Sequence, residues 1–163
     1  MNPTIVSVQG LGYTYLPGTP MAMVALQDAD LTVRQGKISA LVGPSGAGKS
    51  TLVHFLNGLL RPQKKGHVIV FGHDTGAPDC DLLALRRRVG LVFQHPYQQL
   101  LEQYVGDDIA YGPRQLGLSR EQLRERVRWA MDRVGLDFEA FVDRLPFSLS
   151  GGEMRRVALA GIL

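Results

Sequence analysis

Cysteine is nearly missing from this sequence of 163 residues, because Cys80 is the only one. A single cysteine cannot close an internal disulfide, which excludes the disulfide-stapled secreted domains and favours a reducing compartment. Long apolar runs are missing too: the longest, Val157–Leu163, is far too short to cross a bilayer. The first residues show no signal-peptide pattern. We therefore expect that, if this protein has a function at a membrane, it acts there through a partner protein.

The sequence also has no strong excess of charge. Its formal net charge is +3, with 20% charged and 45% hydrophobic residues, which is typical of one globular domain with a real core. So small an excess does not indicate nucleic-acid binding by itself. The histidines, His54, His67, His73 and His95, lack the spacing of metal ligands, which argues against a metal site built from them.

Glycine is abundant, and the residues Gly43 to Ser50 fit the phosphate-binding pattern G-x-x-x-x-G-K-[ST]. We expect a buried strand over 37–42 before this loop and a helix over 51–58 after it. The glycines let backbone N–H groups turn inward around an anion, and the helix adds the positive end of its dipole. In this pattern Lys49 reaches the outer phosphates and Ser50 offers its hydroxyl to Mg²⁺.

A second motif, Leu-Ser-Gly-Gly-Glu, occupies positions 149–153. Ser150 and Glu153 form an S-x-x-E capping box, which starts a helix that we expect to run to the end of the sequence. Gly151 and Gly152 weaken its first turn by about 1 kcal/mol each relative to alanine, a cost that a purely structural cap does not need. The glycines make sense if another group approaches the backbone, so this helix start is a second predicted phosphate-binding device.

The remaining patterns predict strands first and helices afterwards, with no strand from about residue 96 onward. Ser119 and Gln122 predict a capping box. The expected strands cover 4–10 with a continuation over 12–15, 24–33, 66–72 and 89–93. The expected helices cover 82–88, 105–116 with an interruption at Gly112-Pro113, 119–134 and 137–144.

These features together resemble the ATP-binding subunit of ABC transporters over essentially the whole chain. The finer resemblance is to the ATPase subunits of energy-coupling factor (ECF) importers, which take up vitamins and transition-metal ions such as cobalt and nickel. The segments that carry it are Gly90–Pro96 with Gln99-Leu100, Asp108–Pro113 and Met154–Leu163.

The resemblance implies an α/β fold, a P-loop NTPase of the ABC nucleotide-binding type with an N-terminal β-subdomain and a helical insert. It implies a β-rich P-loop core over about 1–94, a helical subdomain over about 95–148, and the signature motif with its helix over 149–163. No apolar strand ending in Asp-Glu follows that helix, so the Walker B glutamate and the switch histidine are not in this sequence. We expect a truncated piece that folds poorly and hydrolyses ATP negligibly alone, cut from an active ATPase.

The resemblance also implies roles for single residues. Gln94 matches the glutamine that contacts Mg²⁺ or the attacking water, and Ser50 is the other implied Mg²⁺ ligand. Tyr15 lies where the family stacks an aromatic ring on adenine, although Tyr13 is an alternative. The residues implied to bind ATP are Gly43, Pro44, Ser45, Gly46, Ala47, Gly48, Lys49, Ser50, Thr51 and Tyr15. Those implied to contact ATP held by a second subunit are Ser150, Gly151, Gly152 and Glu153, with Glu153 standing where the family usually has glutamine.

The implied function is the energising subunit of a membrane importer, at the cytoplasmic face of the membrane, with ATP and Mg²⁺ as cofactors. The implied partners are a second ATPase subunit, identical or paralogous, and an integral-membrane transport subunit, with no direct contact to nucleic acid. One alternative is a soluble ABC-type ATPase acting on nucleic acid or ribosomes, for which the cluster Arg86-Arg87-Arg88 and Arg114 are the argument. Another is a non-catalytic nucleotide-binding fragment.

Overall fold

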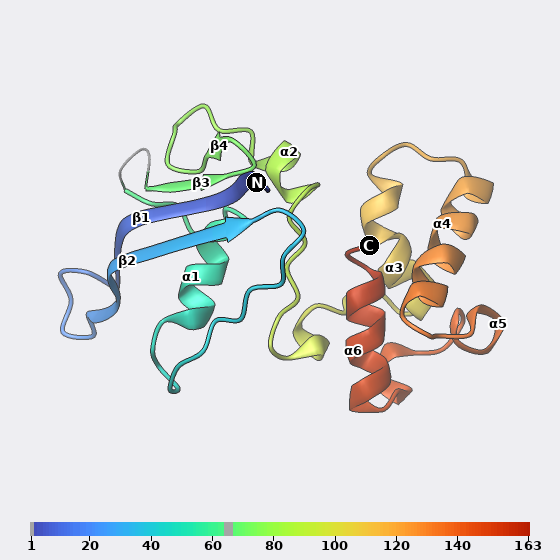
Figure 1. Cartoon of the computed structure of the whole chain (residues 1–163). Helices are drawn as coiled ribbons and strands as arrows, with labels where there is room; N and C mark the ends of the chain where they lie inside the picture. The colour runs from blue at the N-terminus through green and yellow to red at the C-terminus, as the bar shows by residue number, and fades with distance from the viewer. Residues whose placement is uncertain (1, 64–66) are drawn as a thin grey trace. The chain divides into compact units, whose positions relative to one another are not determined.

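The computed structural model describes residues 2–63 and 67–163, and the chain divides into two compact units. The first unit ends at Val89 and the second is Gly90–Leu163; Figure 1 labels their elements. The first unit contains the strands β1 (Thr4–Tyr15), β2 (Met23–Arg34), β3 (Val68–Val70) and β4 (His73–Asp74), and the helices α1 (Lys49–Leu56) and α2 (Leu82–Arg86). The second contains η1 (Pro96–Gln98), α3 (Val105–Arg114), α4 (Arg120–Arg133), α5 (Phe138–Phe141), η2 (Pro146–Ser148) and α6 (Gly151–Ala160).

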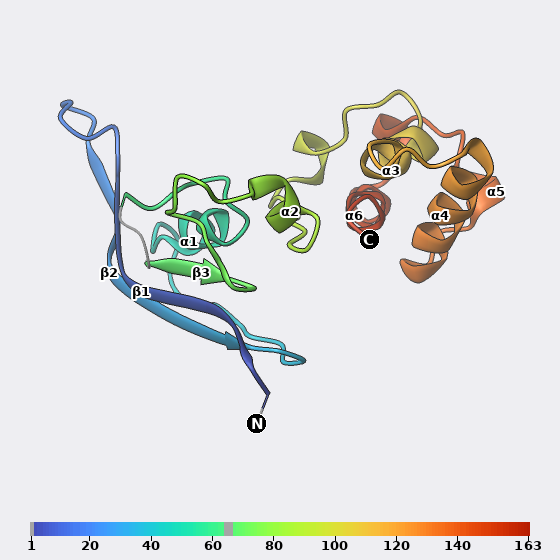
Figure 2. The same cartoon turned by 90° about the horizontal axis from the view of Figure 1, so that it is seen from above.

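The first unit is built on an antiparallel sheet with the strand order β2-β1-β3-β4. Alternation in β1 puts Val6 and Val8 on the buried face, and Phe55 of α1 packs fully buried in the same apolar cluster. Figure 2 shows α1 against one face of this sheet. The first predicted strand is therefore confirmed and extended without a break to Tyr15. Of the predicted strand 66–72, only Val68–Val70 forms β3, and Gly66 lies outside the described residues.

Two predicted strands are wrong. Residues 37–42 and 89–93 form neither strand nor helix. Residues 37–42 are exposed, and Ile38 keeps its entire side chain in solvent. Both segments have the continuous apolar content of strands in a parallel sheet, which are buried on both faces and depend on paired neighbours. In the described residues the only strand pairing is the antiparallel sheet of β1 to β4, which offers these segments no ladder.

The second unit is helical, and its described residues from 96 onward contain no strand, as predicted. Helix α6 packs against α3 and α4, and Figure 2 shows it nearly end-on beside them. Val105, Met131 and Val157, one from each of these helices, are almost completely buried in their shared core. No helix in the described part of the chain is long and apolar enough to span a bilayer.

Both predicted capping boxes are confirmed, at Ser119 with Gln122 and at Ser150 with Glu153. Several predicted helix ends are wrong. Helices α1 and α2 end at Leu56 and Arg86, each two residues before the predicted end. Helix α3 continues through Pro113 to Arg114, because a proline in the last turn removes only one hydrogen bond. Helix α5 ends early at Phe141. Helix α6 ends at Ala160, where the tighter bond from Ile162 N to Leu159 O replaces the helical pattern.

Candidate functional site

The glycine-rich loop enters α1 through Gly48, which has the left-handed φ of 79°. A Cβ atom on Gly48 would collide with the backbone carbonyl of Ala25 on β2 and with the side chain of Leu26, so only glycine fits. Gly46 is also left-handed, with φ 81°, and nothing lies within 4 Å of where its Cβ would stand. The loop is thus held against the sheet at Gly48 and open at Gly46.

The start of α1 suits an anion. The N-cap is Gly48, so no capping side chain covers the free N–H groups of the first turn. The ammonium of Lys49 donates to the carbonyl oxygens of Gly43 at 2.8 Å and Pro44 at 2.7 Å, which holds a positive charge over the loop. The Ser50 side chain is exposed on the same turn. Open amides, a held ammonium and a free hydroxyl fit the phosphates of a nucleotide.

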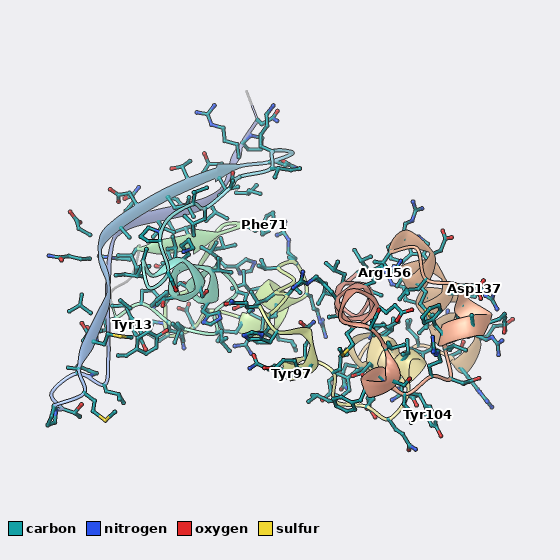
Figure 3. All side chains as sticks on the ribbon, turned by 90° about the horizontal axis from the view of Figure 1, so that it is seen from below. Tyr13, Phe71, Tyr97, Tyr104, Asp137 and Arg156 are labelled. Atoms are coloured by element: carbon teal, nitrogen blue, oxygen red, sulfur yellow. The ribbon has the colours of Figure 1, made fainter. Side chains whose placement is uncertain are left out.

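Two tyrosines of β1 lie in different surroundings. The Tyr15 hydroxyl is 3.2 Å from the Thr51 hydroxyl in the first turn of α1. The Tyr13 ring, labelled in Figure 3, packs edge-on against the Tyr15 ring, with the centroids 4.8 Å apart, and against Phe55 of the core, with the centroids 5.2 Å apart. The structure therefore brings Tyr15, and not Tyr13, into hydrogen-bond contact with the phosphate-loop helix.

The second motif forms the start of α6. Ser150 N donates to Glu153 Oε2 at 2.8 Å, Ser150 Oγ donates to the same oxygen at 2.7 Å, and Glu153 N donates back to Ser150 Oγ at 3.3 Å. The bonds from the Ser150 hydroxyl and amide, with the charges of Arg144 and Arg156, lower the pKa of Glu153. Gly151 and Gly152 have nothing within 4 Å of where a Cβ would stand, so this backbone is open to a ligand.

The loop, the helix it starts and the glycine-rich start of α6 together match a known family. A profile described as "ABC transporter" matches residues 26–163. The chain belongs to the ABC transporter family. The matched region contains every predicted site residue except Tyr15, which lies on β1 before it begins.

Several relatives of this ABC transporter chain are energy-coupling factor (ECF) transporter proteins. It is 44% identical to the ECF transporter ATP-binding protein EcfA2 of Clostridium perfringens, over 97% of this chain and 55% of the relative. It is 48% identical to EcfA2 of Symbiobacterium thermophilum, over 95% of this chain and 53% of the relative. The chain thus spans about half the length of the curated relatives it matches.

Solved structures give the same picture. The structure of cbiO1 from Clostridium perfringens, described as part of the ABC transporter complex cbiONQ, matches with a TM-score of 0.81 and 32% identity, over 100% of this chain and 62% of that one. The ATP-binding cassette MJ0796, solved with ADP and Pi in a dimeric post-hydrolysis state, matches with a TM-score of 0.80 and 27% identity, over 97% and 68% of the two chains. The α/β P-loop fold of an ABC nucleotide-binding domain is therefore shown.

The sequence predicted that Gln94 directly follows a buried strand over 89–93. That strand is not formed, and Gln94 lies exposed in a bend of the second unit. The structure adds a neighbour that sequence reasoning missed. Gln99 Oε1 accepts from Phe93 N at 3.3 Å, and Gln99 Nε2 donates to Ala158 O of α6 at 3.2 Å. Its only sequence signal was membership of the ECF-like string Gln99-Leu100.

The basic cluster offered for nucleic acid in this ABC transporter chain is partly engaged within its own unit. Arg86 donates to the carbonyl oxygens of Asn57 at 3.4 Å and Gly58 at 2.9 Å, which closes the carbonyl end of α1. Arg88 stacks over the Phe71 ring, 4.3 Å from its centroid. These guanidinium groups stabilise local structure, so the cluster does not form a free phosphate-binding strip.

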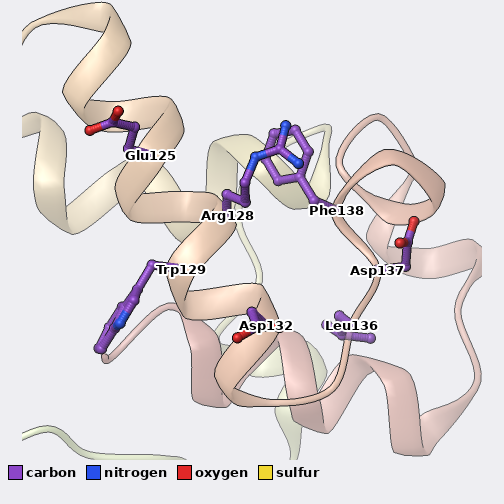
Figure 4. A pocket seen from close by; sticks show the side chains of 7 residues that line it. All are labelled: Glu125, Arg128, Trp129, Asp132, Leu136, Asp137 and Phe138. Carbon is purple, nitrogen blue, oxygen red and sulfur yellow. The ribbon is translucent and has the colours of Figure 1, made fainter.

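A hollow of about 450 Å³ opens between α4 and α5 (Figure 4). Arg128 lies in it, stacked 4.0 Å from the Phe138 ring centroid and paired with Glu139 at 2.8 Å. None of the predicted site residues lines this hollow. The residues that line the hollow are Glu125, Arg128, Trp129, Asp132, Leu136, Asp137 and Phe138.

Within the described residues, no group of three or more His, Cys, Asp and Glu side chains is arranged to hold a metal ion.

Proposed function

We propose that the protein carrying this chain is the ATP-binding, energising subunit of an ECF-type membrane importer that takes up a vitamin or a transition-metal ion. One observation carries the proposal: a single chain presents a phosphate-loop helix that starts at Gly48 without a capping side chain, and a second helix that starts at Ser150 with an open glycine backbone. The similarity to EcfA2 proteins and to cbiO1 supports the importer class. The full protein then hydrolyses ATP at the cytoplasmic face of the membrane.

ATP with Mg²⁺ is the ligand we assign to the first helix start. Its phosphates bind to the loop residues from Gly43 to Thr51 and to the Lys49 ammonium, and the Ser50 hydroxyl is a ligand for Mg²⁺. Tyr15 stacks on the adenine ring. These assignments are supported by the free first turn of α1, the exposed Ser50 and the contact between Tyr15 and Thr51. Gln94 is proposed as a further Mg²⁺ contact on the sequence resemblance alone.

The second helix start is proposed to act on ATP held by another ATPase subunit. Ser150, Gly151 and Gly152 approach the γ-phosphate of that subunit, and their uncovered backbone supports this role. ATP then stabilises a head-to-tail dimer, identical or paralogous, and hydrolysis releases it. The closing and opening of the dimer move an integral-membrane subunit. The bounds about 1–94, 95–148 and 149–163 are our proposed division into core, helical subdomain and signature segment.

The competing proposal, an ATPase that acts on nucleic acid, has less support. Arg86 and Arg88 of its basic cluster are used within the first unit, and Arg114 pairs with Asp107 and Glu102. Such paired guanidinium groups leave little charge to bind phosphates of a polynucleotide.

The test is to purify the full-length protein from detergent-solubilised membranes and from the soluble fraction. We expect it to elute with a second ATPase subunit and an integral-membrane subunit, and the complex to hydrolyse Mg-ATP. Binding to DNA or RNA with a steep loss on adding salt, without a membrane subunit, would overturn the proposal in favour of the nucleic-acid class.

A further inference from the structure

Gln99 joins two segments that the proposed function uses separately. Its side chain accepts a hydrogen bond from Phe93 N, the amide next to Gln94, and donates one to Ala158 O of the helix that starts at Ser150. One amide group thus contacts the Gln94 segment with its oxygen and α6 with its nitrogen. Residues 90–95, which carry Gln94, form no helix or strand, and the bond to Gln99 is one of the contacts that hold them.

The contact at α6 falls on a carbonyl that the helix leaves open. Gly161 N donates to Val157 O, and Ile162 N donates to Leu159 O, so the tightened end of α6 skips Ala158 O. Ala158 itself is 1% exposed, and a hollow of about 170 Å³ lies beside it, lined among others by Gln99 and Gly161. A buried carbonyl needs a partner, and Gln99 supplies it.

The anchor of Gln99 is rigid. Leu100, the next residue, is only 5% exposed and lies in the core of the second unit. The short helix η1, which immediately precedes Gln99, packs against α6. A second close approach lies at Gly90, where a Cβ would stand 3.3 Å from Ile162 Cβ just after α6. The segment around Gln94 therefore contacts α6 and the residues just after it in two places. The contact made by Gln99 is polar, and the one at Gly90 is apolar.

We propose that Gln99 is a positioning residue that couples the Gln94 segment to helix α6, so that closure on ATP at Ser150 changes the order of residues 91–95. This rests on the proposed function, because it requires ATP-dependent closure over Ser150. Gln99 itself touches no nucleotide. It acts because a displacement of α6 moves the Phe93 amide beside Gln94, and a displacement of that amide moves α6.

The test measures amide hydrogen exchange of the full-length protein with its partner ATPase subunit, with and without a non-hydrolysable ATP analogue. In the wild type, the analogue is expected to protect both residues 150–153 and residues 91–95. In Gln99→Met, which has similar size but makes neither bond, protection at 150–153 is kept and protection at 91–95 is lost. Gln98→Met, at an exposed neighbouring position, behaves as the wild type.

The outcomes separate the two proposals. If the analogue protects neither segment in the wild type, the proposed closure over ATP is wrong. If it protects both in the wild type and equally in Gln99→Met, the coupling role of Gln99 is wrong and the proposed function stands. If Gln99→Met exchanges fast everywhere without nucleotide, Gln99→Glu decides, because it keeps the acceptor for Phe93 N and replaces the donor to Ala158 O with a carboxylate oxygen that this carbonyl repels. Loss at 91–95 in that variant supports the role, and wild-type protection overturns it.

Discussion

At the scale of single residues, the Ser150 hydroxyl already has a partner. It donates to Glu153 Oε2 at 2.7 Å, so a phosphate oxygen must take this donor from a carboxylate. The pKa of Glu153 is lowered by the Ser150 bonds, so the carboxylate is ionised at neutral pH and its interaction with Ser150 is lost only as the pH falls through that lowered pKa. In the proposed function, Glu153 therefore competes with the phosphate for the Ser150 donor and repels it by charge.

This competition predicts the effect of Glu153→Gln. The amide retains an oxygen for the capping box but removes the negative charge beside the phosphate. We expect ATP-dependent dimerisation of the full-length protein to stay equal or tighten, measured by sedimentation with a non-hydrolysable analogue. Weaker dimerisation of the variant would show that the carboxylate helps the closed state rather than opposing it.

Asp108, in the first turn of α3, gives a prediction with the opposite pH dependence. Its Oδ1 accepts from Leu101 N at 2.8 Å and Glu102 N at 3.1 Å, while Oδ2 is buried without a hydrogen bond in the described structure. Burial is the main cause that raises the pKa of this carboxyl. The folded state then holds the proton more tightly than the unfolded state, so stability falls as the pH rises past the ordinary aspartate range.

The measurement is the free energy of unfolding of the full-length protein, from chemical denaturation, between pH 4 and 7. In the wild type we expect this free energy to decrease with rising pH. Asp108→Asn keeps an acceptor oxygen without a charge, so its free energy of unfolding should decrease less over this range. Asp132→Asn, at an exposed position of α4, serves as the control with the wild-type response. An unchanged pH response in Asp108→Asn would contradict the assignment.

At the scale of elements, two helices of the second unit start with the same device. Helix α4 has the box of Ser119 with Gln122, and α6 has the box of Ser150 with Glu153. Both serines accept from the N3 amide, at 3.2 Å and 3.3 Å. Only the α6 start has glycines at its first two positions. Comparing the two helix starts therefore distinguishes the stabilising effect of the cap from any additional role in binding phosphate.

This similarity gives a matched pair of variants. Ser119→Ala and Ser150→Ala should each lower local helix stability by about 1 kcal/mol through loss of the cap. Only Ser150→Ala should weaken ATP-dependent dimerisation, because only Ser150 faces a second nucleotide in the proposed function. Helix stability is read from hydrogen exchange and dimerisation from sedimentation. Equal loss of dimerisation in both variants would mean that Ser150 is only a cap.

The helices could be predicted from sequence because their start signals are local. Serine with glutamine or glutamate three residues later fixes a start without reference to the rest of the chain. Strands such as β1 were predictable because alternation marks a half-buried strand. Residues 37–42 and 89–93 were not, since an apolar run predicts burial but does not supply the neighbouring strand that hydrogen bonding needs. The end of α6 was missed because the run from Val157 stays apolar beyond the last helical bond.

At the scale of the whole molecule, the described chain carries a phosphate loop in its first unit and a signature helix in its second. The loop was predictable to the residue, since glycines that need φ near 80° and a lysine after them leave a plain pattern. The bridge made by Gln99 was not, because a side chain that joins residues 93 and 158 leaves no trace in either local segment. The contact of Tyr15 with Thr51 likewise depends on how the strand and the helix meet.

The central claim, that this loop binds the phosphates of ATP, is tested most directly by the ATP affinity of the full-length protein. Lys49→Ala removes the charge held by the loop, whereas Lys37→Ala removes an exposed lysine shortly before it. A charge-assisted bond is worth about 1.5–3 kcal/mol, so we predict that Lys49→Ala weakens binding by about tenfold or more in isothermal titration. Lys37→Ala should bind as the wild type does. Equal affinity of wild type and Lys49→Ala would contradict the account.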